Sequence, residues 1–288
     1  MPNYAEPFFG SGAVLLGRES EPGTETVNDL DCMLANFYRA LQHAPEEVAF
    51  HADNPVNEAD QHARHLWLCS QVEFRERMKT EPDFYDTKIA GWWVWGQCIW
   101  IGSGWCSVQL PSRQLPHLGD AGRGIHRQRP HLGPGSHGTT KSPNDRRIGG
   151  IYDYMQVLSA RFRRVRVCCG DWSRILGPSV TFKHGLTGVF LDPPYSDEAG
   201  RDPNIYAEES GTVAHDVREW AIANGDNPLL RICVAGYEGE HQFPADWECV
   251  AWKPGGGYDG QNKDRDNHNN KRERLWFSPH CRKPHSLF

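Results

Sequence analysis

The residues of this chain whose types and spacing could do chemistry gather in two short stretches. One spans residues 191–195 and reads Leu-Asp-Pro-Pro-Tyr, directly after the apolar run 188–191. We expect that run to form a buried strand that the two prolines end, because neither can donate a ladder hydrogen bond. The stiff turn would hold the Asp192 carboxylate and the Pro193 carbonyl beside the Tyr195 ring. Two acceptors and a flat ring suit a planar substrate that carries an amino group.

The second stretch lies near the start of the chain and reads Glu-Pro-Phe-Phe-Gly-Ser-Gly over residues 6–12. Gly10 and Gly12 allow a tight turn and a close approach of the backbone to a ligand. We expect a strand over residues 3–7 before this turn and the first turn of a helix at Ala13 after it. A Gly-x-Gly turn alone predicts little, so the order of the two stretches in the chain carries the argument.

Glu-Pro-Phe-x-Gly-x-Gly, then Asn28-Asp29, then Asp-Pro-Pro-Tyr resembles the motif order of the D12 class of N6-adenine DNA methyltransferases, which contains the Dam-type enzymes. The resemblance is closest to the phage and prophage forms. It implies an α/β fold: a Rossmann-like S-adenosylmethionine-dependent methyltransferase sheet with helices on both faces and an inserted target recognition region. It implies catalytic roles for Asp192, Pro193, Pro194 and Tyr195, and cofactor contacts from Glu6, Pro7, Phe8, Gly10, Gly12, Asp29, Asp171, Trp172 and Asp192.

Two of these acids have a simpler structural role open to them. Asp29 follows the expected second strand at residues 24–27, where an acid in a Rossmann-like sheet accepts hydrogen bonds from ribose hydroxyls. Asp29 or Asp31 could instead cap the helix expected over residues 32–42. Asp171 follows the strand expected over 164–168. The family uses an acid there to bind the cofactor's adenine amino group, and a second helix cap is the alternative.

The resemblance places the catalytic domain at residues 1–101 and 151–288, with a helical segment at about 43–101. Within that segment we expect one helix from Glu58 to Met78 that buries Leu66, Cys69 and Val72 on one face. Residues 88–101 carry four tryptophans, for which core packing is the favoured role. After residue 150 we expect helices at 151–162 and 213–221, and strands at 229–235, 248–252 and 273–277.

Residues 102–150 differ in composition, being rich in Gly, Pro, His and Arg. A long loop inside a compact domain is usually functional, and the family carries its target recognition region between the cofactor and catalytic motifs. A disordered insertion is the alternative. Seven basic residues stand against two acids between Arg113 and Arg147. We expect double-stranded DNA to contact these basic side chains: Arg113, Arg123, Arg127, Arg129, Lys141, Arg146 and Arg147.

The whole chain has 288 residues, 38% of them hydrophobic, and a net charge of −6. It lacks an apolar run near the ~20 residues that span a bilayer and a basic, apolar leader. We therefore expect no membrane partner and a cytoplasmic location, in the host cell if the protein is phage-encoded. Nine scattered cysteines without a Cys-x-x-Cys pair favour buried thiols over zinc or disulfides. We expect no metal site; the oligomeric state stays open, with a monomer plausible.

One family feature has no counterpart here. D12 enzymes carry a Pro-Gly-Gly-Lys-like segment before the cofactor motif, whereas Met1 stands just before Tyr4 and no Gly-Gly-Lys occurs elsewhere. Three functions therefore remain open. The first is site-specific methyl transfer from S-adenosylmethionine to the N6 of a flipped adenine. The second is a weakly active or inactive remnant that binds DNA or cofactor. The third is methylation of another amino group, with cytosine N4 the hardest to exclude.

Overall fold

The computed structural model describes residues 1–18, 23–100, 105–106, 150–194, 213–239, 241–252 and 272–281. The predicted DNA contacts from Arg113 to Arg147 lie outside the described residues, and so does Tyr195. The chain divides into two compact units. The first joins Met1–Leu30 to Val165–Phe288, and the second is Asp31–Arg164.

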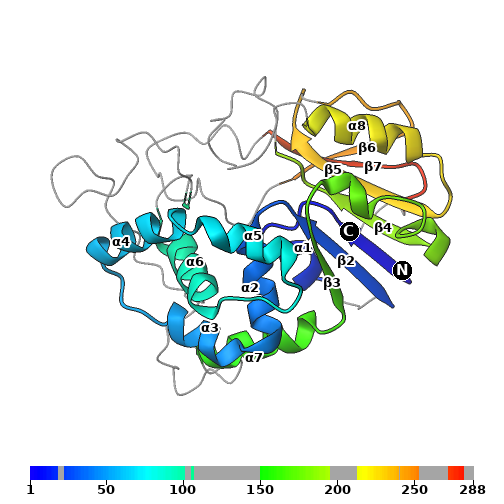
Figure 1. Cartoon of the computed structure of the whole chain (residues 1–288). Coiled ribbons are helices and arrows are strands. Elements are labelled where there is room, and N and C mark those ends of the chain that lie inside the picture. Colours follow the sequence, from blue (N-terminus) through cyan, green and yellow to red (C-terminus); the bar gives the residue numbers. More distant parts are fainter. Residues whose placement is uncertain are drawn as a thin grey trace, which may run out of the picture. The chain divides into compact units, whose positions relative to one another are not determined.

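The first unit is built on a mixed sheet in which seven strands are described (Figure 1). Their order is β3-β2-β1-β4-β5-β7-β6, with parallel pairing from β3 to β5 and antiparallel pairing of β7 with β5 and β6. The predicted α/β class is confirmed, and the sheet is compatible with a Rossmann-like fold. The strands are β1 (Asn3–Glu6), β2 (Thr24–Asp29), β3 (Val165–Cys169), β4 (Thr187–Leu191), β5 (Leu230–Tyr237), β6 (Glu248–Ala251) and β7 (Glu273–Phe277).

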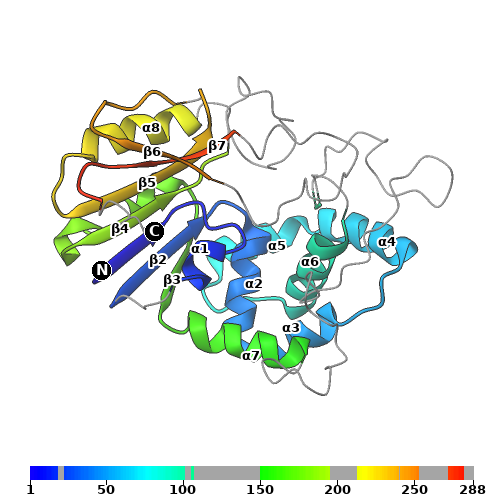
Figure 2. The same cartoon turned by 180° about the vertical axis from the view of Figure 1, so that it is seen from behind.

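A hydrophobic cluster of this unit packs against one face of the sheet. Val189 and Leu191 alternate along β4, and their side chains pack with Ile232 of β5 and with Val217 of α8 (Val213–Asn224). α8 packs against β5, and Figure 2 shows it at this end of the sheet. Burial of each such side chain contributes about 1.5–3 kcal/mol, so this face anchors the strand that leads to Asp192.

Short helical turns follow two strands of the sheet, β1 and β3. A single turn, α1 (Ala13–Leu16), comes after β1 and ends at Gly17. Two 3-10 turns, η2 (Trp172–Ile175) and η3 (Phe182–His184), connect β3 to β4. η2 begins near the carboxyl end of β3, whereas η3 directly precedes the amino end of β4, beside the start of β1, where the Asn3 side chain donates to the Val180 and Thr181 carbonyls.

The second unit is helical, and its helices pack around aromatic side chains. Phe37 and Trp93 have ring centroids 6.0 Å apart, and Trp95 and Trp100 are also buried. Core packing is thus confirmed for three of the four tryptophans in the segment, while Trp92 is half-buried. The helices are α2 (Cys32–His43), α3 (Pro45–Ala52), α4 (Glu58–Cys69), α5 (Val72–Thr80), α6 (Thr87–Ile99) and α7 (Ile151–Phe162).

The single helix predicted from Glu58 to Met78 is wrong, because the chain breaks between α4 and α5. The side chains of Ser70 and Gln71 both donate to the Trp67 carbonyl, which removes an acceptor that a continuing helix would use. The predicted buried face is wrong as well, since Leu66 is 51% exposed and Val72 is 76% exposed. The face that α4 buries carries Gln61, Arg64, His65 and Leu68.

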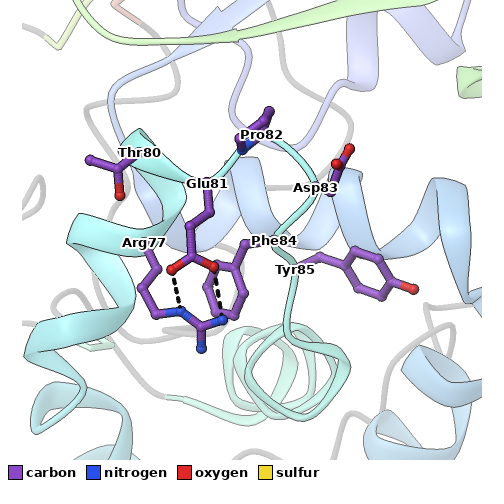
Figure 3. A pocket seen from close by; sticks show the side chains of 7 residues that line it. All are labelled: Arg77, Thr80, Glu81, Pro82, Asp83, Phe84 and Tyr85. Carbon is purple, nitrogen blue, oxygen red and sulfur yellow. Dashed lines mark hydrogen bonds and ion pairs between the residues drawn. The ribbon is translucent and has the colours of Figure 1, made fainter.

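The second unit also contains an open hollow of about 460 Å³ beside the end of α5. Figure 3 shows its lining, in which the Arg77 guanidinium pairs with the Glu81 carboxylate through two hydrogen bonds. The same guanidinium carbon lies 3.7 Å from the centroid of the Phe84 ring. Arg77 and Glu81 in this lining therefore pair with each other.

Candidate functional site

The two chemistry-bearing stretches meet at the centre of the sheet in the first unit. Strands β1 and β4 are parallel neighbours, with Asn3 opposite Thr187 and Ala5 opposite Val189. The strand order reverses between them: β2 and β3 continue on the β1 side, and β5 on the β4 side. Open α/β sheets bind ligands outside the carboxyl ends of strands at such a reversal. Glu6 ends β1 there, and Asp192 directly follows β4.

The turn after β1 is held by its own backbone. Gly10 and Gly12 have φ of +47° and +69°, in the left-handed region that favours glycine. The Gly12 N–H donates to the Phe9 carbonyl at 2.8 Å, and the Phe9 N–H donates to the Asn28 carbonyl at 3.0 Å. A Cβ on Gly12 would come within 2.6 Å of the Phe9 ring. The turn therefore requires glycine at Gly12 for both conformation and space.

The two aspartates near the end of β2 have different roles. The Asp31 side chain accepts from the Met33 N–H at 2.8 Å, so Asp31 is the N-cap of α2. Asp29 Oδ2 accepts from the Gly10 N–H at 2.9 Å. Asp31 therefore takes the helix-cap role, while Asp29 binds the backbone of the glycine turn.

Asn28, to which the sequence assigned no role, joins three strand ends. Its Nδ2 donates to the Pro7 carbonyl at 3.1 Å and to the Gly170 carbonyl at 2.8 Å. The Gly170 N–H in turn donates to the Asp29 carbonyl at 3.1 Å. The loops after β1, β2 and β3 are therefore fixed to one another. The signal available in the sequence was the position of Asn28 beside Asp29 at the end of an expected strand, and the structure leaves this side chain only 1% exposed.

The loop after β3 brings an acid and a ring to this edge. Asp171 Oδ1 accepts from the Ser173 N–H at 3.0 Å, so the helix-cap alternative is realised for Asp171 at η2. The carboxylate is nevertheless exposed. The Trp172 ring stacks with the Phe8 ring, at a centroid distance of 6.0 Å and an angle of 26°. Residues of the β1 and β3 loops thus form an aromatic pair next to the glycine turn.

Glu6 is a buried acid whose surroundings disfavour its charge. It is 2% exposed, and Tyr4 Oη donates to its Oε2 at 2.8 Å. The pKa of Glu6 is raised to about 8, chiefly by burial; the Tyr4 hydrogen bond opposes this rise and the Asp192 carboxylate adds to it. The Arg18 guanidinium carbon lies 4.2 Å from the Tyr4 ring centroid. Sequence reasoning missed Tyr4, although its spacing of two from Glu6 along a strand predicts a shared face.

The turn after β4 presents Asp192 to solvent. Asp192 is exposed, whereas Leu191 and Pro193 on either side of it are buried and Pro194 is half-buried. Buried neighbours fix the backbone, so the carboxylate projects from a rigid position. Pro7 at the end of β1 is likewise buried, and Phe8 is half-buried.

The described residues hold no group of three His, Cys, Asp or Glu side chains placed to bind a metal ion. His65, on α4, packs against Trp100 and Trp105 with ring centroids 5.1 and 5.6 Å away. Burial lowers the pKa of His65 to about 4. It therefore acts as a neutral core side chain.

Comparison of the chain with models of protein families finds no match, and comparison with curated proteins finds no relative. None of the described helices is both long enough and apolar enough to cross a membrane.

Proposed function

We propose that this chain is an S-adenosylmethionine-dependent DNA methyltransferase that acts on the N6 amino group of an adenine flipped out of double-stranded DNA. One observation carries the proposal. The glycine turn that follows Glu6 and the Asp-Pro-Pro corner at Asp192 lie at the ends of neighbouring parallel strands, where the sheet reverses its order. The motif order in the sequence supports the same activity.

The residues at this edge fit the cofactor by their chemistry. The turn at Gly10 and Gly12 offers close backbone approach, the Phe8 and Trp172 rings offer a stacking surface for a base, and Asp29 offers a carboxylate for ribose hydroxyls. When bound, S-adenosylmethionine supplies a methyl group activated by a sulfonium cation. Glu6, the last residue of β1, is a buried carboxyl that precedes the glycine turn, and a cation beside it would favour its ionised form.

The Asp-Pro-Pro corner provides acceptors for a substrate amino group. Asp192 and the Pro193 carbonyl would accept its two N–H donors, which favours a pyramidal nitrogen and stabilises the positive charge that develops there. Tyr195 follows Pro194 in the sequence, and we expect its ring to stack on the base. An amino group inside a duplex cannot reach such a corner, so the base must leave the helix.

The test is transfer of tritiated methyl groups from S-adenosylmethionine to duplex DNA. We expect Asp192→Ala to abolish transfer while calorimetry shows that cofactor binding survives. The control is Asp216→Ala, which removes an exposed acid on α8 and should leave transfer unchanged. Normal turnover in Asp192→Ala would overturn the assignment.

The same experiment distinguishes the proposed activity from two alternatives, methylation of cytosine N4 and binding of the cofactor without transfer. Digesting the methylated DNA to nucleosides and weighing them distinguishes N6-methyladenine, as we expect, from N4-methylcytosine. Cofactor binding without transfer by the unaltered protein would instead indicate a remnant that has lost activity.

A further inference from the structure

Ser173 lies at the carboxyl edge of the sheet, just after Asp171 and Trp172, and the proposed reaction gives it no part. It is the second residue of η2, and it is exposed. The Ser173 N–H and the Ser173 hydroxyl both donate to the same oxygen of the Asp171 carboxylate, Oδ1. Two donors on one atom fix the rotation of that carboxylate. Ser173 therefore determines which oxygen of Asp171 remains for a ligand.

The other carboxylate oxygen of Asp171 is Oδ2. It accepts no hydrogen bond from the residues that the structure describes. Asp171 is exposed, so a ligand at this edge of the sheet can reach its carboxylate. An ionised carboxylate has acceptors and no donor. Asp171 therefore presents one oriented acceptor at the place where the cofactor is proposed to bind.

The backbone before Asp171 is held by the neighbouring strand. The Gly170 N–H donates to the Asp29 carbonyl at 3.1 Å, and the Gly170 carbonyl accepts from Asn28 Nδ2 at 2.8 Å. With the main chain fixed in this way, the freedom that remains to Asp171 is the rotation of its side chain. The hydrogen bonds from Ser173 restrict that rotation, so the acceptor has both a fixed place and a fixed direction.

The surroundings of this acceptor suit a flat ring that carries an N–H donor at its edge. The Trp172 ring, next in the chain, stacks with the Phe8 ring at a centroid distance of 6.0 Å. A base with an amino group gains a hydrogen bond from Asp171, whereas a base with a carbonyl oxygen in that place meets an acceptor with which it cannot pair. Adenine has an amino group at C6, and hypoxanthine has a carbonyl oxygen there.

We propose that Ser173 is a positioning residue that gives the cofactor site its preference for adenine. Its hydroxyl and N–H hold Asp171 Oδ1, so that Oδ2 accepts from the amino group of the ligand. The inference rests on the proposed function, because it concerns the same cofactor site. A Ser173 that only stabilised the loop would support the binding of either base equally, so the ratio of two affinities separates the two roles.

The test is calorimetric titration with S-adenosylhomocysteine and with S-inosylhomocysteine, in which a carbonyl oxygen replaces the amino group at C6. Neither ligand can donate a methyl group, so binding is measured without DNA and without turnover. We expect the unaltered protein to bind the adenosyl ligand at least about tenfold more tightly than the inosyl ligand. Ser173→Ala should reduce this ratio at least about threefold, and Ser173→Thr, which keeps the hydroxyl, should restore it.

The matched control is Ser70→Ala. It removes an exposed hydroxyl that also makes one local hydrogen bond, to the Trp67 carbonyl in the second unit. Its ratio of affinities should equal that of the unaltered protein.

A second variant tests the orientation itself. In Asp171→Asn the Ser173 N–H can donate only to the amide oxygen, so the amide nitrogen takes the place of Oδ2 and presents a donor to the ligand. We expect this variant to prefer the inosyl ligand. Loosening of the loop alone would not invert the preference. The inversion is measured within one variant, so it stays decisive if Ser173→Ala fails to fold.

The outcomes separate this inference from the proposed activity. Equal losses of affinity for the two ligands in Ser173→Ala, or an Asp171→Asn variant that still prefers the adenosyl ligand, would overturn the inference and leave the proposed methyl transfer standing. The expected ratios in a protein that transfers no methyl group would support the inference and defeat the proposed activity. A protein that binds neither ligand would overturn both.

Discussion

A buried carboxyl at the centre of a sheet is costly when it is ionised. Glu6 is such a carboxyl, and its surroundings favour the protonated form. Burial and the Asp192 carboxylate oppose its negative charge. The Tyr4 hydroxyl, Arg18 and the Leu15 backbone favour that charge. With a pKa of about 8, the carboxyl keeps its proton near neutrality. A cation bound at this edge of the sheet would reverse that preference, so protonation and cofactor binding should be linked at this residue.

Glu6 should make folding stability fall as the pH rises. Its pKa is about 8 when folded and near 4.5 in its ordinary state. Between these values the folded protein holds a proton that the unfolded chain has lost. The free energy of unfolding should therefore drop by up to about 1.4 kcal/mol per pH unit, with the loss complete above pH 8. Urea unfolding of the unaltered protein and of Glu6→Gln at pH 5.5, 6.5 and 7.5 measures this.

The difference between those two proteins isolates Glu6 from other titrating groups, such as His65, whose lowered pKa acts in the opposite direction. Glu219→Gln on α8 removes an exposed carboxylate and should keep the slope of the unaltered protein. Parallel slopes for Glu6→Gln and the unaltered protein would show that Glu6 is ionised throughout.

The glycine turn gives a second prediction at the scale of single residues. Gly12→Ala places a methyl group 2.6 Å from the Phe9 ring in a left-handed backbone, whereas Gly10→Ala meets no atom within 4 Å. A left-handed conformation alone costs a non-glycine residue about 1–2 kcal/mol. Urea unfolding should therefore show that the free energy of unfolding falls by that much in both variants. Gly12→Ala should lose more, since Phe9 must shift. Equal losses would mean that the turn relaxes without disturbing Phe9.

At the scale of elements, Asn28 is the residue that joins the loops of β1, β2 and β3. Asn28→Ala leaves the buried Pro7 carbonyl and the Gly170 carbonyl without their side-chain donor. We expect a loss of about 2 kcal/mol or more in the free energy of unfolding and weaker cofactor binding by calorimetry. The matched control is Asn224→Ala at the end of α8, which removes one bond to the Trp220 carbonyl. Its cofactor binding should be unchanged, and an equal loss of affinity in both would contradict the joining role.

Elements with strong local patterns could be predicted from the sequence. β1 and α2 fall within one residue of their expected bounds, and the apolar run before Asp192 is β4. The break between α4 and α5 could not be predicted in this way. Ser70 and Gln71 end the helix through side-chain hydrogen bonds to the Trp67 carbonyl, and the spacing of apolar residues does not indicate such bonds. The spacing of apolar residues also does not indicate that β1 pairs with β4, because the two strands are far apart in the sequence. That pairing brings Glu6 near Asp192. The motif order alone pointed to it.

At the scale of the whole molecule, a chain with a net charge of −6 must concentrate its positive charge to bind DNA. The basic residues between Arg113 and Arg147 lie outside the described residues, so their role stays a prediction. Neutralising Arg127 and Arg129 together to Gln should weaken DNA binding. It should also flatten the plot of log affinity against log salt by about 2, since each phosphate contact contributes about 0.9. Fluorescence anisotropy with a labelled duplex measures both, and an unchanged slope would place these arginines outside the interface.

The most direct test of the shared site is ultraviolet crosslinking of S-adenosylmethionine, labelled in its methyl group, to the unaltered protein. Peptide mapping should find the label in peptides that contain Phe8 or Trp172. These two stacked rings lie in the loop that holds the glycine turn and in the segment after β3. Excess unlabelled S-adenosylhomocysteine should remove it. A protein that takes up no label, or one labelled only within Asp31–Arg164, would contradict the proposal that the cofactor binds where β1 and β4 end.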